Sequence, residues 1–154
     1  SSMFKGSFFC HYYQHNLNIM SFKNILIDAK DLFKESYQQQ SIMHMIINNY
    51  LINKKNYSSL RNDLKSDNLS LEIKFISIPG EIISKFVKIL EKYQIRIDRT
   101  VCGHYVTNFY DKSNGEFSVI ANQIINGLND NEVLLIPKNI ENKGIFEKFF
   151  QIFS

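Results

Sequence analysis

The stretch LSLEIKFISIPGEIISKFVKILEKYQIRIDRTV (residues 69–101) decides the fold that the sequence predicts. Its first ten residues alternate apolar with polar side chains, as Ile73 and Phe75 alternate with Glu72 and Lys74. Successive side chains of a β-strand point to opposite faces, so this period of two predicts a strand with one face near solvent.

The second half of the same stretch predicts a helix and a further strand. Pro79 suits a first helical turn, and Glu81 favours the positive end of the helix. Apolar residues then recur at three- and four-residue steps, which is the spacing of an amphipathic helix. Ile95 and Ile97 resume the alternation of a strand. We therefore expect a βαβ or split-βαβ unit around 69–101.

Outward from this unit, the pattern predicts elements of both types. The expected strands are 8–13, 22–28 and 132–137, and the expected helices are 30–54, 117–128, ended by a left-handed Gly127 or Asn129, and 144–154. The fold class expected is α+β, with residues 1–154 forming one domain. Its four- or five-stranded mixed or antiparallel sheet is expected to carry helices on one face, with the terminal helix 144–154 separable from the rest.

Composition indicates an ordinary globular chain. Apolar residues make up 44% of the 154 residues and charged residues 21%, so gross disorder is not expected. The net charge of +3 is too small to indicate a nucleic-acid-binding protein by itself. With six glycines, the chain shows neither a Walker A loop nor a GxGxxG fingerprint, and we predict no nucleotide or other cofactor.

Cysteine usage and hydropathy indicate the compartment. Two cysteines allow one disulfide at most, and secreted domains of this size are more often rich in cysteine. The sequence shows neither a secretory signal nor an apolar run that approaches the ~20 residues of a membrane span. We therefore expect a reducing, cytoplasmic setting.

Cysteine and histidine cluster with aromatic residues near the start and near the middle of the chain. The candidate metal ligands are Cys10, His15, Cys102 and His104. Zinc accepts these ligand types, but structural sites draw pairs with gaps of about two to four residues, whereas one glycine separates Cys102 from His104. We therefore predict no metal and expect these groups to pack inside an apolar strand or strand end.

Two catalytic alternatives stay open. Cys102 with His104 is a candidate nucleophile and base, since an adjacent imidazole lowers the pKa of a thiol. Asp28 closes the predicted strand 22–28, and strand-end carboxylates serve metal-dependent phosphoryl chemistry. Buried cysteines are usually inert, and a lone strand-end carboxylate is weak evidence. A non-enzymatic protein is therefore preferred to a small enzyme.

A basic stretch, KKNYSSLRNDLK (54–65), suggests a second alternative. Its candidate nucleic-acid contacts are Lys54, Lys55, Tyr57, Arg61 and Lys65. Cationic groups and one aromatic ring suit phosphates and a stacked base. Because Asp63 interrupts the charges, a solvated surface loop is the preferred interpretation.

The end of the chain carries four phenylalanines at helical spacing. These candidate interaction residues are Phe146, Phe149, Phe150 and Phe153. Left uncovered, they would form an apolar patch of a kind that soluble monomers rarely tolerate. We expect the helix 144–154 to dock on the protein itself or on a second subunit, with peripheral membrane contact as the alternative. The preferred function is a protein-interaction or regulatory domain that binds a protein partner, most simply another copy as a homodimer.

Overall fold

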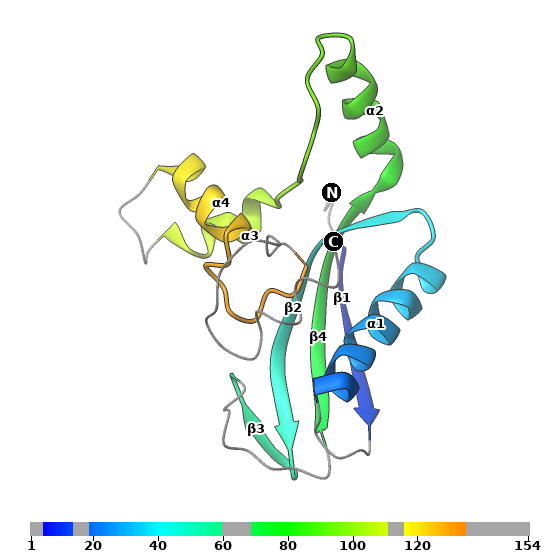
Figure 1. Cartoon of the computed structure of the whole chain (residues 1–154), viewed down its shortest axis with the longest axis vertical. Helices are drawn as coiled ribbons and strands as arrows, with labels where there is room; N and C mark the ends of the chain where they lie inside the picture. Colours follow the sequence, from blue (N-terminus) through cyan, green and yellow to red (C-terminus); the bar gives the residue numbers. More distant parts are fainter. Residues whose placement is uncertain (1–4, 14–18, 60–68, 111–115, 135–154) are drawn as a thin grey trace.

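A computed structural model of the chain describes residues 5–13, 19–59, 69–110 and 116–134 (Figure 1). The elements in these ranges are β1 (Lys5–Tyr13), α1 (Ile19–Ser36), β2 (Gln40–Ile52), β3 (Lys55–Tyr57), β4 (Leu69–Pro79), α2 (Gly80–Glu91), α3 (Gly103–Thr107) and α4 (Phe117–Ile125). The α+β class expected from the sequence is confirmed.

The sheet is built around β4, which pairs antiparallel with β1 on one side and with β2 on the other. The three-residue β3 extends the outer edge of β2, so the order is β1-β4-β2-β3. The described sheet therefore has three long antiparallel strands and a short hairpin extension. Of the expected four- or five-stranded mixed or antiparallel sheet, the described residues show the antiparallel form and no βαβ unit.

A two-residue turn joins β2 to β3. Ile52 pairs with Lys55, and the residues between them, Asn53 and Lys54, have φ angles of 49° and 64°. Two consecutive positive φ angles are the signature of the type I′ turn, whose twist matches that of the two strands. Lys54 adopts this left-handed conformation with a Cβ atom, which is unfavourable for residues other than glycine.

A second short segment pairs with the same edge of β2. The Ile47 N–H donates to the Asn131 carbonyl at 2.9 Å, and the Val133 N–H donates to the Met45 carbonyl at 2.8 Å. Glu132 lies between them as an antiparallel bridge to β2. The predicted strand 132–137 thus begins as one bridge, and its residues from 135 onward lie outside the described ranges.

The first core cluster lies between α1 and one face of the sheet. Phe22, Leu26 and Phe33 recur at four- and seven-residue steps along α1, and all three are buried. They pack on β4 and β2, where the Phe33 and Phe75 rings stack with centroids 4.6 Å apart. Val133 joins the same cluster from the segment beside β2.

The second core cluster lies on the opposite face. Met45 belongs to the first cluster and its neighbour Ile46 to the second, because adjacent strand residues face opposite sides. Ile46 packs with Val106 of α3 and with Ile120 and Ile124 of α4. Helices therefore cover both faces of the sheet, and the prediction that they lie on one face is wrong.

Two element predictions before β4 are also wrong. Residues 22–28 are part of α1 rather than a strand, and the predicted helix 30–54 covers the end of α1 and all of β2. Irregularities between Ile42 and His44 and between Ile47 and Asn49 shift the phase of β2. A bulge inserts one residue, so it spaces same-face residues by three and imitates a helical period.

The connection after α2 departs from the predicted βαβ unit. Gln94 has a φ angle of 59°, and the Ile95 N–H donates to the Leu90 carbonyl at 3.0 Å, which forms a left-handed helix cap. Residues 95–102 then belong to no strand in the described structure, so the predicted strand there is wrong. Figure 1 shows α2 projecting beyond the end of the sheet, with this connection returning to α3.

Other predictions are confirmed. The strands 8–13 and 69–78 correspond to β1 and β4, and α2 begins directly after Pro79. The helix 117–128 corresponds to α4, which ends at Ile125, and Gly127 just beyond it has the left-handed conformation, with a φ angle of 89°. The terminal helix 144–154 lies outside the described residues.

Candidate functional site

A buried group of hydrogen-bonded residues is centred on His44. It lies on β2 in the apolar run IMHMII, and its side chain is fully buried. Its Nδ1 lies 3.0 Å from Oε2 of Glu132, and the Cys102 N–H donates to its Nε2 at 2.9 Å. Because Nε2 accepts a backbone N–H, the proton must be on Nδ1, which donates to the carboxylate.

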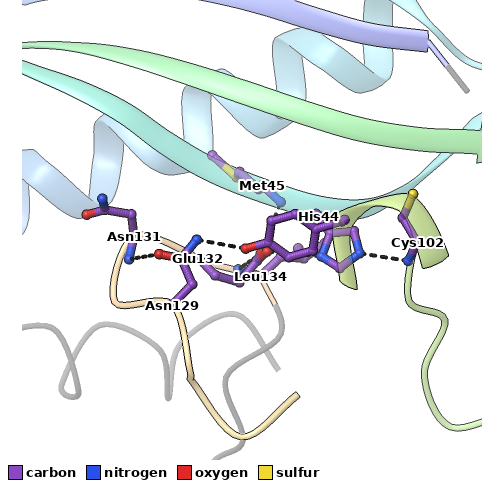
Figure 2. A network of polar contacts seen from close by, with 8 residues as sticks. His44, Met45, Cys102, Asn129, Asn131, Glu132 and Leu134 are labelled. Carbon is purple, nitrogen blue, oxygen red and sulfur yellow. Dashed lines mark hydrogen bonds and ion pairs between the residues drawn. The ribbon is translucent and has the colours of Figure 1, made fainter. Parts of the chain in front are cut away.

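Glu132 reaches this histidine from the segment that bridges to β2, and it too is fully buried. Its second oxygen, Oε1, accepts the backbone N–H groups of Met45 at 3.1 Å and Leu134 at 3.2 Å. Figure 2 shows these contacts converging on the carboxylate from β2 and from its own segment. A buried carboxylate needs such donors, since isolated burial of the charge is very costly.

Tyr105 of α3 covers the histidine ring. The two ring centroids are 4.3 Å apart, and the tyrosine hydroxyl accepts an N–H of Asn129 at 2.7 Å. Burial raises the pKa of Tyr105, and the nearby charge of Glu132 raises it further. The hydroxyl therefore stays protonated throughout the neutral range.

This group of four residues, His44, Cys102, Tyr105 and Glu132, is termed the His44 network. It joins three segments that are distant in the sequence: β2, the start of α3 and residues 129–134. Both ring nitrogens of His44 are already engaged, and the imidazole and the carboxylate are both buried. The geometry therefore suits a structural role, in which the hydrogen bonds hold α3 and residues 129–134 against β2.

Cys102 and His104, the predicted nucleophile and base, lie at the start of α3. Cys102 precedes its first residue and is buried with a free thiol, whereas His104 is exposed. The expected apolar strand or strand end is instead the start of a helix, where residues two apart do not face each other. The network uses the backbone N–H of Cys102 and not its sulfur.

The four candidate metal ligands are not placed as a group. Cys10 lies on β1, on the far side of β4 from β2, and His15 lies outside the described residues. Within the described ranges, no three His, Cys, Asp or Glu side chains come close enough to hold a metal ion.

Asp28, the predicted strand-end carboxylate, is exposed within α1.

The basic stretch 54–65 lies partly inside and partly outside the described residues. Lys54 and Lys55 are exposed at the β2–β3 turn, and Tyr57 packs partly against the first core cluster. Arg61 and Lys65 lie outside the described residues, as do Phe146, Phe149, Phe150 and Phe153.

A surface feature of α2 forms the second candidate site. Its apolar residues fall on one side of the helix, yet none of the residues of α2 is buried in the described structure. Phe86 is 57% exposed, Ile89 52% and Tyr93, just past the helix end, 72%. This surface, termed the α2 face, consists of Ile82, Ile83, Phe86, Val87, Ile89, Leu90 and Tyr93.

The opposite side of α2 is polar. Glu81, Ser84, Lys85, Lys88 and Glu91 are all exposed there. Lys85 pairs with Glu81 at 2.6 Å across one helical turn, and this contact lowers the pKa of Glu81. Exposed pairs of this kind contribute little to stability. The helix is thus amphipathic, with a solvated polar side and an apolar side that the described residues cover only in part.

Sequence reasoning missed the His44 network and misplaced the α2 face. His44 was expected on a helix, whereas its apolar neighbours mark a strand covered on both faces. The available signal for the partner of His44 was Glu132, a lone acidic residue at the start of an apolar run. The apolar side of α2 was predicted, but the βαβ prediction implied that it packs against the sheet.

In the described part of the chain, no helix is both long and apolar enough to span a bilayer. No protein-family model matches the chain, and no curated protein matches it significantly. Function therefore has to be argued from the two sites themselves.

Proposed function

We propose that this chain is a non-enzymatic protein-interaction domain that self-associates, and that the α2 face is its contact surface. One observation carries the proposal: an amphipathic helix projects from the sheet with Phe86, Ile89 and Tyr93 exposed on its apolar side in the described structure. Contiguous apolar patches of this kind on soluble proteins commonly mark interaction sites.

The α2 face has the chemical make-up of an interface core. Phe86 and Tyr93 supply aromatic area, and Ile89 lies between them along the helix. Interface cores favour such residues and exclude charge, and the charged groups of α2 lie on its other side. Covering three half-exposed side chains contributes roughly 1 kcal/mol each, which is enough to support weak association.

A second copy of the chain is the partner that this surface favours. A two-fold contact brings the same patch of both subunits together, so the patch must complement itself. A face made only of aliphatic and aromatic groups meets this condition. No charged side chain of one copy would be buried opposite the same charged side chain of the other.

The His44 network supports the non-enzymatic half of the proposal. A general base needs a ring nitrogen within reach of a substrate proton. Nε2 of His44 accepts the Cys102 N–H instead, and the ring is fully buried. Its contacts stabilise the fold beneath α3 and α4.

Two matched variants on α2 test the proposal. Phe86→Glu places a charge in the centre of the α2 face, whereas Ser84→Glu makes the same charge change on the polar side. Light scattering after gel filtration should show weaker self-association for Phe86→Glu, by about tenfold or 1.4 kcal/mol, and an unchanged mass for Ser84→Glu. Equal masses for the parent protein and both variants at every concentration would contradict the proposal.

A further inference from the structure

The connection that follows α2 has the alternating sequence pattern of a β-strand, but it pairs with no strand in the described structure. Ile95 and Ile97 alternate with Arg96 and Asp98. In the described structure these residues belong to no strand, and Ile95, Arg96 and Asp98 are exposed. Residues 95–99 are termed the 95–99 segment. A strand pattern without a ladder partner is a template for pairing with another chain.

The charges of the 95–99 segment complement themselves in one register. In a two-fold antiparallel pair, the residue on the axis faces its own copy, and its neighbours face each other crosswise. With Ile97 on the axis, Arg96 lies opposite Asp98 of the second copy, and this happens twice. Opposite charges across a strand pair are favourable, whereas like charges directly opposite are unfavourable.

Neighbouring registers lack this match. An axis at Asp98 places that carboxylate opposite itself, and an axis at Arg96 does the same with two guanidinium groups. The register centred on Ile97 also places this apolar side chain opposite its copy. The sequence of residues 95–98 therefore favours one register when the same segment of two copies pairs.

The segment is continuous with the α2 face. The left-handed conformation of Gln94 ends α2 and directs the chain into the 95–99 segment at once. A second copy that covers the α2 face brings its own 95–99 segment to the same region. The helix contact and the strand contact can therefore share one two-fold axis.

From these observations we infer that the 95–99 segments of two copies pair as antiparallel strands about Ile97, with Arg96 of each copy opposite Asp98 of the other. This inference rests on the proposed function, because it specifies the contact through which the copies associate. It assigns a pairing role to residues that belong to no strand in the described structure.

Charge exchange tests the pairing. Arg96→Asp leaves carboxylates at both positions of one copy, and Asp98→Arg leaves guanidinium groups at both. Each variant alone should self-associate at least about tenfold more weakly than the parent in sedimentation velocity. The double exchange should return to within about threefold of the parent, because the cross-strand pairs are restored.

Mixing the two single variants gives the sharpest result. The acidic copy should pair one-to-one with the basic copy and form dimers that neither forms alone. Lys88→Glu is the matched control, since it makes the same charge change as Arg96→Asp on the exposed polar side of α2. Circular dichroism of each variant checks that these exposed substitutions leave the fold unchanged.

The outcomes separate the two proposals. A monomeric parent protein overturns both. Dimers that Phe86→Glu disrupts but the charge variants leave unchanged overturn the strand pairing and preserve the α2 contact. Failure of the double exchange to recover, or absence of mixed dimers, also overturns the pairing about Ile97.

Discussion

Nδ1 of His44 lies 3.0 Å from Oε2 of Glu132, in a fully buried pair that joins positions 88 residues apart in the chain. The same carboxylate accepts two backbone N–H groups, and the same imidazole accepts a third. The hydrogen bonds of this one pair thus fix β2, residues 131–133 and the start of α3 relative to one another.

Removing the carboxylate should be strongly destabilising. Glu132→Ala leaves the N–H groups of Met45 and Leu134 and the Nδ1–H of His44 without their acceptor. Each buried donor left unsatisfied costs about 1–3 kcal/mol, so the three together should cost at least about 3 kcal/mol, which urea unfolding measures.

Glu132→Gln sharpens the test of the tautomer. The amide retains one acceptor oxygen, so in either orientation its NH₂ group faces a donor, either the Nδ1–H of His44 or the backbone N–H groups, and most of the loss should persist. Glu91→Ala on exposed α2 is the control, with a change within about 0.5 kcal/mol. A change for Glu132→Gln as small as the control would contradict the assigned hydrogen bonds.

The β2–β3 turn offers a stabilising substitution. Lys54 has a φ angle of 64°, which glycine adopts at no steric cost. Lys54→Gly also creates the Asn-Gly pair that type I′ turns prefer, so the midpoint of urea unfolding should rise by the equivalent of about 1 kcal/mol.

Lys55→Gly is the matched control for the turn. Lys55 belongs to β3, where glycine only adds freedom to the unfolded chain, so the free energy of unfolding should fall by about 0.5–1 kcal/mol. Destabilisation by Lys54→Gly would be inconsistent with the left-handed backbone at residue 54.

Alkaline pH should reduce the free energy of unfolding through two tyrosines. Burial raises the pKa values of Tyr50 and Tyr105 above the ordinary value of about 10. The unfolded chain therefore releases these protons first. The contribution of these two tyrosines to the free energy of unfolding is complete below about pH 10. It is lost as the pH rises further, by up to about 1.4 kcal/mol per pH unit for each tyrosine.

Urea titrations from about pH 8 to about pH 11 check this slope. Tyr105→Phe keeps the ring on His44 and removes the ionising hydroxyl, so its stability should fall less steeply over the same interval. Parallel curves for the variant and the parent would argue against a buried, protonated Tyr105.

The thiol of Cys102 should react slowly. Its side chain is 3% exposed, so a thiol reagent reaches it only after local or global opening. In a Cys10→Ser background, labelling near neutral pH should be at least about a hundredfold slower than in urea, equivalent to about 2.8 kcal/mol of opening. Equally fast labelling in both conditions would restore Cys102 as a candidate nucleophile.

Strong local patterns predicted the β4–α2 part of the fold. Leu71, Ile73 and Phe75 alternate without interruption, and Pro79 marks the change from strand to helix. These signals act over neighbouring residues, so the sequence alone was sufficient. The cap at Gly127 was predicted for the same reason, because glycine tolerates the left-handed conformation that ends α4.

Tertiary context decided what the sequence could not. β2 is buried on both faces and carries two irregularities, so its apolar residues fall at helical spacing. The first half of α1 was too short an apolar run to separate a helix from a strand. The contact between His44 and Glu132 depends on how β2 and residues 131–133 meet, which local patterns do not encode.

Sedimentation equilibrium of the 154-residue chain over a wide concentration range tests self-association most directly. We predict an apparent mass that rises from 18.1 kDa toward twice that value as the concentration increases. A constant mass of 18.1 kDa at every concentration would contradict the claim that the α2 face binds a second copy.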